Sequence, residues 1–180
     1  MKVALITAAR MNSRRYPGKC LATFRGKPLL QHTIDLAVEL RLPIFVHTRD
    51  KEILEYVSAR CLVLYEPEYL FDQPKSMTLE RMRFCNRVLH ADYVVLLQPT
   101  HPIRKTEIIK EWIDKTVACK AAYASSKMPM GEALQESGSF YMWSASKLLG
   151  NGSGPNATFI EEPPIDLHTP EDFARYESAN

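Results

Sequence analysis

The chain has 180 residues, of which 46% are hydrophobic and 24% charged, and its formal net charge at pH 7 is +2. These values predict one globular domain spanning residues 1–180. So small a net charge argues against nucleic acid as a partner. No apolar run approaches the roughly 20 residues that span a membrane, so we expect no membrane partner. The four cysteines form no C-x-x-C pair, which predicts reduced thiols and a cytoplasmic protein.

The apolar residues predict that strands and helices alternate along the chain. Short apolar runs predict strands at residues 2–8, 44–46, 61–65, 92–98, 121–125 and 139–143. Apolar residues at helical spacing predict helices at residues 28–42, 51–59, 78–90 and 106–117, and a last one after Thr169. This alternation is typical of an α/β fold with an open, mostly parallel, Rossmann-like sheet flanked by helices.

One predicted strand is unusually apolar, and two segments show no regular pattern. Residues 92–98 are nearly all apolar, so we expect a central strand that is covered on both faces. Residues 66–77 and 127–137 lack a strand or helix pattern, and we expect an irregular loop and a short connection there.

A basic stretch joins the first strand to the first helix at residues 7–19, TAARMNSRRYPGK. It has no acidic residue and carries four cations: Arg10, Arg14, Arg15 and Lys19. Small residues keep the loop slim, so that backbone N–H groups can approach a ligand: Ala8, Ala9, Ser13 and Gly18. Open α/β sheets bind ligands at the carboxyl ends of their central strands. The stretch therefore predicts a phosphate-bearing ligand, with a solvated basic loop as the alternative.

The same stretch carries a resemblance to a known family. Together with GKPLLQHTIDLA at residues 26–37, it resembles the amino-terminal signature of sugar cytidylyltransferases, most nearly the acylneuraminate type, with Kdo and spore-coat polysaccharide relatives. LLQPTHPIR at residues 96–104 and GSFYMW at residues 138–143 resemble two further family segments. The resemblance implies a nucleotide-diphospho-sugar transferase fold and transfer of CMP from CTP to an acidic sugar, with release of pyrophosphate.

The resemblance implies roles for the residues of the basic loop. The predicted nucleotide-binding residues are Ala8, Ala9, Arg10, Ser13, Arg14, Arg15 and Lys19. Lys75 is a further candidate for phosphate binding, unless it is a solvated loop lysine. Arg10 and Lys19 are also predicted to be catalytic, together with Asp166.

Asp166 and His168 are the predicted metal ligands. They lie two residues apart in a segment that reads as extended, so both side chains should share one face. The family has I-D-I-D here, and its two aspartates bind Mg²⁺, whereas this chain has His168 at the second aspartate. The resemblance therefore implies a divalent metal, Mg²⁺ or Mn²⁺. Alternatively, Asp166 holds the metal with phosphates and water, and His168 only flanks the last helix. Glu171 and Asp172 are expected to be structural residues in the first helical turn.

Gln98 and Tyr141 are the predicted contacts to the acceptor. Without the resemblance, the alternative for Gln98 is a hydrogen bond to the backbone at the strand end. The alternative for Tyr141 is an inward-facing core residue. Cys20 and Glu66 stand where the family has an asparagine and an arginine near the cytosine base. Glu66 could instead accept from an exocyclic amine, so the base stays open.

The family's long dimerisation arm is missing, because only residues 127–137 stand in its place. We therefore expect a monomer or a weak dimer. The sequence predicts a metal-dependent cytidylyltransferase that uses CTP and an acidic small-molecule acceptor. Alternatives are a nucleotide-binding protein without turnover, or a nucleotidyltransferase that uses another base. The four loop cations favour an enzyme, because a phosphate chain would offset their mutual repulsion.

Overall fold

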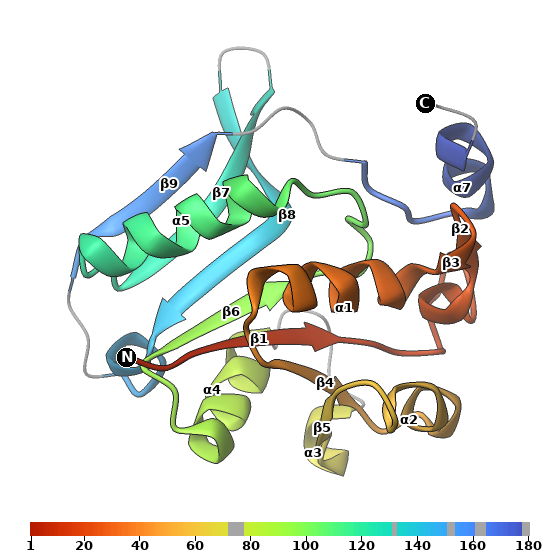
Figure 1. The fold of residues 1–180 in the computed structure, drawn as a ribbon, viewed down its shortest axis with the longest axis horizontal. Coiled ribbons are helices and arrows are strands. Elements are labelled where there is room, and N and C mark those ends of the chain that lie inside the picture. Colours follow the sequence, from red (N-terminus) through yellow and green to blue (C-terminus); the bar gives the residue numbers. More distant parts are fainter. Residues whose placement is uncertain (72–77, 131–132, 151–153, 161–164, 178–180) are drawn as a thin grey trace.

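A computed structural model describes residues 1–71, 78–130, 133–150, 154–160 and 165–177 of the chain (Figure 1). Its strands are β1 Val3–Ala8, β2 Thr23–Phe24, β3 Lys27–Pro28, β4 Ile44–Thr48, β5 Leu62–Tyr65, β6 Tyr93–Leu97, β7 Tyr123–Met130, β8 Ala133–Ser144 and β9 Asn156–Ile160. Its helices are α1 Leu29–Leu40, α2 Lys51–Val57, α3 Glu68–Phe71, α4 Thr78–Leu89, α5 Thr106–Ala118, α6 Ala145–Leu148 and α7 Pro170–Glu177, with a 3-10 turn at Lys19–Leu21.

Seven strands form one sheet in the order β5-β4-β1-β6-β8-β7-β9. β1 pairs in parallel with β4 on one side and with β6 on the other, and β5 extends this parallel part. β8 runs antiparallel to both of its neighbours, and β9 is parallel to β7. The predicted fold class, an open and mostly parallel α/β sheet, is confirmed.

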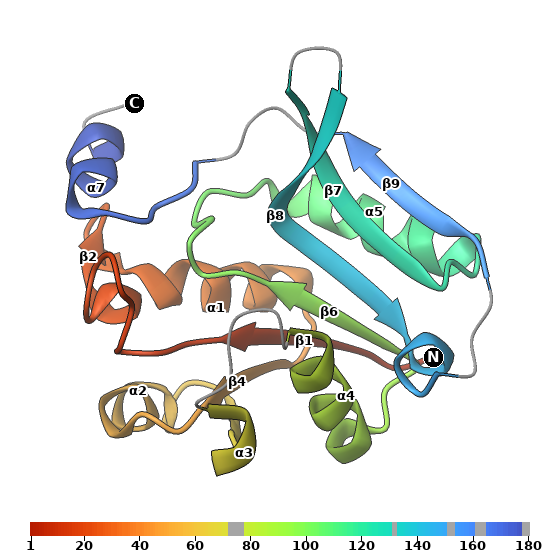
Figure 2. The same cartoon turned by 180° about the vertical axis from the view of Figure 1, so that it is seen from behind.

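Helices cover both faces of this sheet (Figures 1 and 2). Side chains of a strand alternate between the faces, and Leu5 of β1 packs in a cluster with Trp112 of α5. The neighbouring Ile6 packs in another cluster with Met82 of α4. All five residues of β6 are buried, as predicted for a central strand. No helix in the described ranges is long and apolar enough to cross a membrane.

The expectation of a short connection at residues 127–137 is wrong. β7 continues to Met130 and β8 begins at Ala133, so the two strands form a ribbon that projects beyond the rest of the sheet (Figure 1). The outer part of the ribbon has no core to face, so its sequence lacks the apolar alternation that marks a strand. The strand register shifts between Ser125 and Lys127, and Ser126 Oγ bonds Ser137 Oγ there at 2.6 Å.

Five further elements were missed by the sequence patterns. The short helix α3 lies within the expected loop, and α6, β9 and the β2–β3 hairpin were not expected. These elements are short or lie at an edge, where apolar periodicity is weak. Ile108 lies in the helix predicted at residues 106–117 but is 40% exposed.

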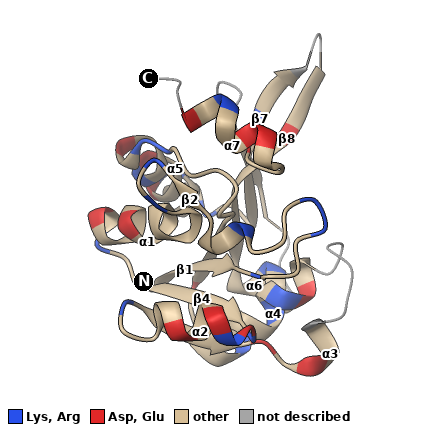
Figure 3. Ribbon diagram, turned by 90° about the vertical axis from the view of Figure 1, so that its right-hand side faces the viewer, with Lys and Arg blue, Asp and Glu red and all other residues tan. Residues whose placement is uncertain are grey.

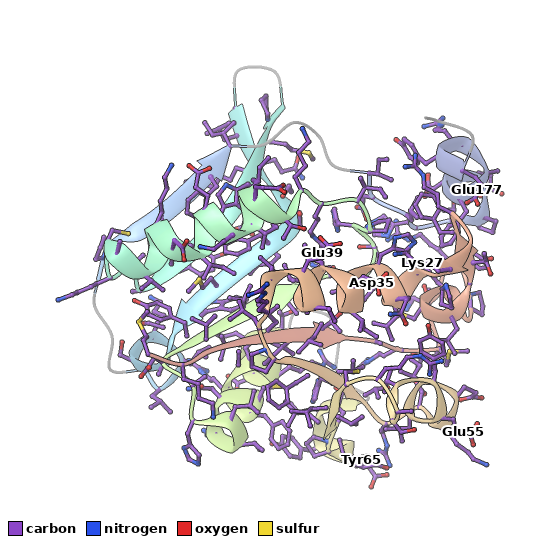
Figure 4. The ribbon with its side chains drawn as sticks, in the orientation of Figure 1. Lys27, Asp35, Glu39, Glu55, Tyr65 and Glu177 are labelled. Carbon is purple, nitrogen blue, oxygen red and sulfur yellow. The ribbon has the colours of Figure 1, made fainter. Side chains whose placement is uncertain are left out.

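The last helix begins as predicted, with Thr169 as its cap. Thr169 Oγ1 accepts from the N–H of Asp172 at 3.3 Å, and Asp172 Oδ2 accepts from the N–H groups of Thr169 and His168. Burial by itself raises the pKa of Asp172, but these hydrogen bonds outweigh it, so the pKa lies below its ordinary value. Glu177, at the other end of α7, accepts from the N–H of Arg25 in the β2–β3 hairpin (Figure 4).

Candidate active site

The basic loop follows β1, which lies between β4 and β6 in the parallel part of the sheet. Arg14 and Arg15 are exposed on this loop. The N–H groups of Ser13 and Gly18 both donate to Met11 O, at 2.9 and 2.7 Å, and Gly18 has a φ of 75° that glycine adopts without strain. The loop is therefore closed on itself and presents its two exposed arginines to solvent.

Ala8 and Ala9 lie where β1 meets the loop. Ala8 is the last residue of β1, and Ala9 is fully buried. The N–H of Ala9 donates to His47 O at 3.1 Å, so this N–H is used within the protein. The predicted backbone contacts to a ligand therefore depend on other N–H groups of the loop.

Arg10 is oriented by a buried carboxylate. Its Nη2 lies 2.7 Å from Glu66 Oε1, and Arg81 Nε of α4 bonds the same oxygen at 2.7 Å. Burial by itself raises the pKa of Glu66, but the hydrogen bonds from the two arginines outweigh it and keep the pKa below its ordinary value. Glu66 is 1% exposed, so little of its surface is open to a base. Whether Glu66 also accepts from an exocyclic amine stays a prediction.

Lys19 joins the basic loop to the carboxyl-terminal segment. It is 6% exposed, and its Nζ donates to Leu167 O at 3.2 Å and lies 3.5 Å from His168 Nδ1. His168 Nε2 in turn lies 2.7 Å from Asp166 Oδ2. Asp166 and His168 share one face, as the alternation predicted, while Leu167 between them is fully buried. Three predicted site residues, Lys19, Asp166 and His168, thus meet at one place.

The buried imidazole of His101 lies on the other side of Asp166. Its Nε2 donates to Ser137 O at 3.0 Å and is 3.8 Å from Asp166 Oδ1. Burial lowers the pKa of His101 to about 4, so the ring is neutral at pH 7 and forms no ion pair. A Cβ at Gly138 would lie 3.3 Å from His101 Cε1, and Gly138 has a φ of 81°, so glycine suits this position.

One oxygen of Asp166 is suited to a divalent cation. Oδ1 is buried and has no hydrogen-bond partner within the described part of the chain. Carboxylate oxygens are preferred ligands of Mg²⁺ and Mn²⁺. No group of three or more His, Cys, Asp or Glu side chains in the described ranges could enclose a metal. With further ligands from phosphates and water, Asp166 and His168 could hold such a metal.

Gln98 and Tyr141 line a pocket of about 660 Å³ beside this site. Tyr141 stacks on Trp143, with ring centroids 5.8 Å apart and an interplanar angle of 14°. Tyr123 donates to Glu136 at 2.9 Å on the same wall. Burial, together with the Glu136 carboxylate, raises the pKa of Tyr141 to about 12, so this hydroxyl stays protonated.

The remaining predicted residues are not drawn into one cluster. Arg10 is bonded to Glu66, and Arg14 and Arg15 stay exposed. Lys75 lies outside the described residues. The sequence did not predict that Arg81 binds Glu66 beside Arg10, or that His101 lies next to Asp166. The histidine within LLQPTHPIR, just after the strand predicted at residues 92–98, was the available signal.

The open α/β sheet with a basic loop at the carboxyl end of β1 is the arrangement that the resemblance to nucleotidyltransferases implied. A sequence profile described as "Cytidylyltransferase" matches residues 4–139. The chain therefore belongs to the cytidylyltransferase family, whose members are nucleotidyltransferases.

Curated relatives share parts of the sequence. An N-acylneuraminate cytidylyltransferase of Streptococcus agalactiae is 35% identical over 117 residues, which cover 62% of this chain and 28% of that protein. A CMP-N,N'-diacetyllegionaminic acid synthase of Legionella pneumophila is 25% identical over an alignment of 228 positions, which covers 97% of this chain and 94% of that protein. The chain spans 28% of the length of the streptococcal relatives.

Solved structures share the fold. A CMP:2-keto-3-deoxy-manno-octonic acid synthetase complexed with CTP has a TM-score of 0.84 at 16% identity, covering 99% of this chain and 98% of that one. A Mycobacterium tuberculosis protein in complex with manganese has a TM-score of 0.68 at 16% identity, covering all of both chains (100% each).

Proposed function

We propose that this chain is a metal-dependent cytidylyltransferase that transfers CMP from CTP to an acidic sugar or a similar small acceptor and releases pyrophosphate. The observation that carries this proposal is the meeting of Lys19 with the Asp166–His168 pair. It joins a predicted phosphate-binding loop to a predicted metal site, 149 residues apart in sequence. Family membership supports the choice of CTP.

The loop cations hold the triphosphate in this proposal. Arg14 and Arg15 are exposed and can meet a polyanion without first losing a buried bond. Glu66 and Arg81 hold Arg10 in a fixed orientation, and Lys19 is fixed by Leu167 O. Cations fixed in advance stabilise charge that develops during phosphoryl transfer without reorganising at that moment.

Asp166 and His168 would hold the divalent metal, Mg²⁺ or Mn²⁺. The metal would neutralise negative charge on the phosphate oxygens. The buried, unpartnered Oδ1 of Asp166 supports this role. The manganese complex of a protein with the same fold is consistent with Mn²⁺ at such a site.

The acceptor would lie in the pocket lined by Gln98 and Tyr141. Gln98 directly follows β6, so it stands at the same sheet edge as the basic loop. A side-chain amide there can orient the attacking oxygen toward the α-phosphate, because nucleotidyl transfer requires an in-line approach. The protonated Tyr141 hydroxyl, which is hydrogen-bonded to Glu136, can accept from an acceptor hydroxyl.

Two alternatives have specific support. Within the described residues, no three-ligand metal group forms, which favours a nucleotide-binding protein without turnover. Cys20 is 7% exposed where the family has a base-contacting asparagine, which favours another NTP.

We further propose that the chain acts in the cytoplasm as a monomer or weak dimer, because the family's arm is replaced by the β7–β8 ribbon. Sedimentation velocity that finds a tight dimer at all concentrations would contradict the monomer proposal.

Calorimetric titration with CTP in the presence of Mn²⁺ tests the proposal. Arg14→Ala and Lys19→Ala should each weaken CTP binding by roughly 1.5–3 kcal/mol, because each removes a charge-assisted contact. Arg14 is exposed, so its variant should stay folded even if Lys19→Ala does not. Arg87→Ala, at an exposed arginine of α4, is the control and should bind CTP as the wild type does. Unchanged affinity in both loop variants would refute the proposal.

A further inference from the structure

The pocket beside the proposed active site extends well away from the reacting edge. Gln98 lies at the carboxyl end of β6, while Tyr93, at the other end, pairs with Ser144 at the end of β8. At about 3.3 Å per residue, these two ends of β6 are about 16 Å apart. Lys147 of α6 follows Ser144 and lines the same pocket. An acceptor seated at Gln98 can therefore extend along the sheet toward α6.

Two cations of this chain line the α6 end of the pocket. Arg83 of α4 donates from Nε to Leu148 O at 2.8 Å, which fixes its guanidinium beside α6. Arg83 also pairs with Glu80 at the protein surface. Lys147 is exposed, and its Nζ has no hydrogen-bond or ion-pair partner within the described residues. Basic residues of α4 lie beside α6 in Figure 3. This end of the pocket suits an anionic group.

The wall between the two ends suits a chain of hydroxylated carbons. The stacked rings of Tyr141 and Trp143 offer apolar surface to C–H groups. The Glu136 carboxylate, which already accepts from Tyr123, has further lone pairs for acceptor hydroxyls.

We propose that the acceptor is an extended polyhydroxylated molecule with an anionic group remote from its attacking hydroxyl, and that Lys147 and Arg83 bind this remote anion. This inference rests on the proposed function for the adjoining edge. A carboxylate and a phosphate share the chemistry that the two cations recognise.

Calorimetry on the full chain tests the inference with three probes: glucitol 6-phosphate, gluconate and the neutral glucitol. We expect one or both anionic probes to bind at least about tenfold more tightly than glucitol. The difference between glucitol 6-phosphate and gluconate tells a phosphate from a carboxylate. Lys147→Gln and Arg83→Gln should each weaken binding of the preferred anion by about tenfold.

Two controls locate the binding. Lys110→Gln removes an exposed lysine of α5, across the sheet from the pocket, and should change nothing. Arg15→Ala tests whether the probe binds at the basic loop instead, and should also leave probe binding unchanged. Lys147→Gln should bind CTP as tightly as the wild type does. Failure of the wild type itself to bind CTP would refute the proposed function, independently of the result for the remote anion.

Three results would overturn the inference. One is equal binding affinity for glucitol and for both anions. Another is loss of probe binding in Arg15→Ala but not in Lys147→Gln. The third is the absence of detectable binding of both anionic probes to the wild-type chain.

Discussion

Glu66 is the residue on which the orientation of Arg10 depends. Glu66→Ala would leave two guanidinium groups facing a buried site without their shared carboxylate, and Arg81 is only 7% exposed. We expect unfolding free energy to fall by about 3–5 kcal/mol. CTP affinity should also fall, because Arg10 would lose its fixed orientation. Urea denaturation measures the first effect and calorimetry the second.

The matched control for this change is Glu55→Ala. Glu55 forms an exposed ion pair with Lys51 at 3.6 Å, so its loss should cost less than about 1 kcal/mol (Figure 4). Equal stability losses in the two variants would show that the Glu66 cluster has no special role.

The pair of Asp166 and His168 predicts an unusual metal preference. A carboxylate with an imidazole is a poorer Mg²⁺ site than two carboxylates, because Mg²⁺ prefers oxygen, and Mn²⁺ tolerates nitrogen better. Turnover should be higher with Mn²⁺ than with Mg²⁺. His168→Asp should shift the preference toward Mg²⁺, and Asp166→Ala should abolish turnover with either ion. Pyrophosphate release measures all three.

His168→Ala separates this account from its alternative. If His168 only flanks the cap of α7, this variant would keep the wild-type ratio of Mn²⁺ to Mg²⁺ activity.

At the residue scale, the sequence predicted the arrangement of residues within one segment better than contacts between distant segments. Alternation along an extended segment was enough to place Asp166 and His168 on one face. The contact of Lys19 with Leu167, and that of Arg10 with Glu66, join segments far apart in the chain. No local pattern carries such contacts, because they depend on how the elements pack.

The element that holds the metal segment in place is α7. Asp172→Ala removes the carboxylate that accepts from the N–H groups of His168 and Thr169. We expect a loss of about 1 kcal/mol in unfolding free energy, as for other lost helix caps. We also expect that more metal is needed to reach half-maximal activity. Thermal denaturation and a metal titration measure these effects. Glu171→Ala, in the same helical turn and exposed, should change neither, and a matching loss there would argue against the cap.

The strands and helices differ in how clearly the sequence signals them. The buried strand β6 and the amphipathic helix α5 were predicted because their apolar periodicity reflects their packing. The cap of α7 was predicted because Thr169 and Pro170 are local signals. The β7–β8 ribbon was missed because much of its outer surface faces solvent and its pairing depends on contacts between strands.

For the whole molecule, the buried His47 predicts how stability depends on pH. His47 is fully buried, and neither ring nitrogen has a hydrogen-bond partner within the described residues. Burial lowers its pKa from 6.5 to about 4, although Glu66 opposes the shift and Arg81 adds to it. The folded state therefore keeps His47 neutral where the unfolded chain binds a proton. The contribution of neutral His47 to the free energy of unfolding is complete above pH 6.5 and is lost as the pH falls toward 4.

His47→Leu should remove this dependence, because a neutral side chain cannot take up the proton. Between pH 7 and pH 4, the wild type should lose about 3 kcal/mol more unfolding free energy than His47→Leu. Urea denaturation at several pH values measures the difference. His90→Asn is the control, because His90 is exposed and its φ of 48° is tolerated by asparagine. Parallel pH profiles for wild type and His47→Leu would contradict the account.

Pyrophosphate release from each of the four common NTPs, measured with Mn²⁺ and a panel of acidic sugars, tests the central claim most directly. The account predicts release from CTP that depends on both the metal and an acceptor, and that is lost in Asp166→Ala. Release from a different NTP, or no release from any of the four under conditions where CTP binds, would contradict it.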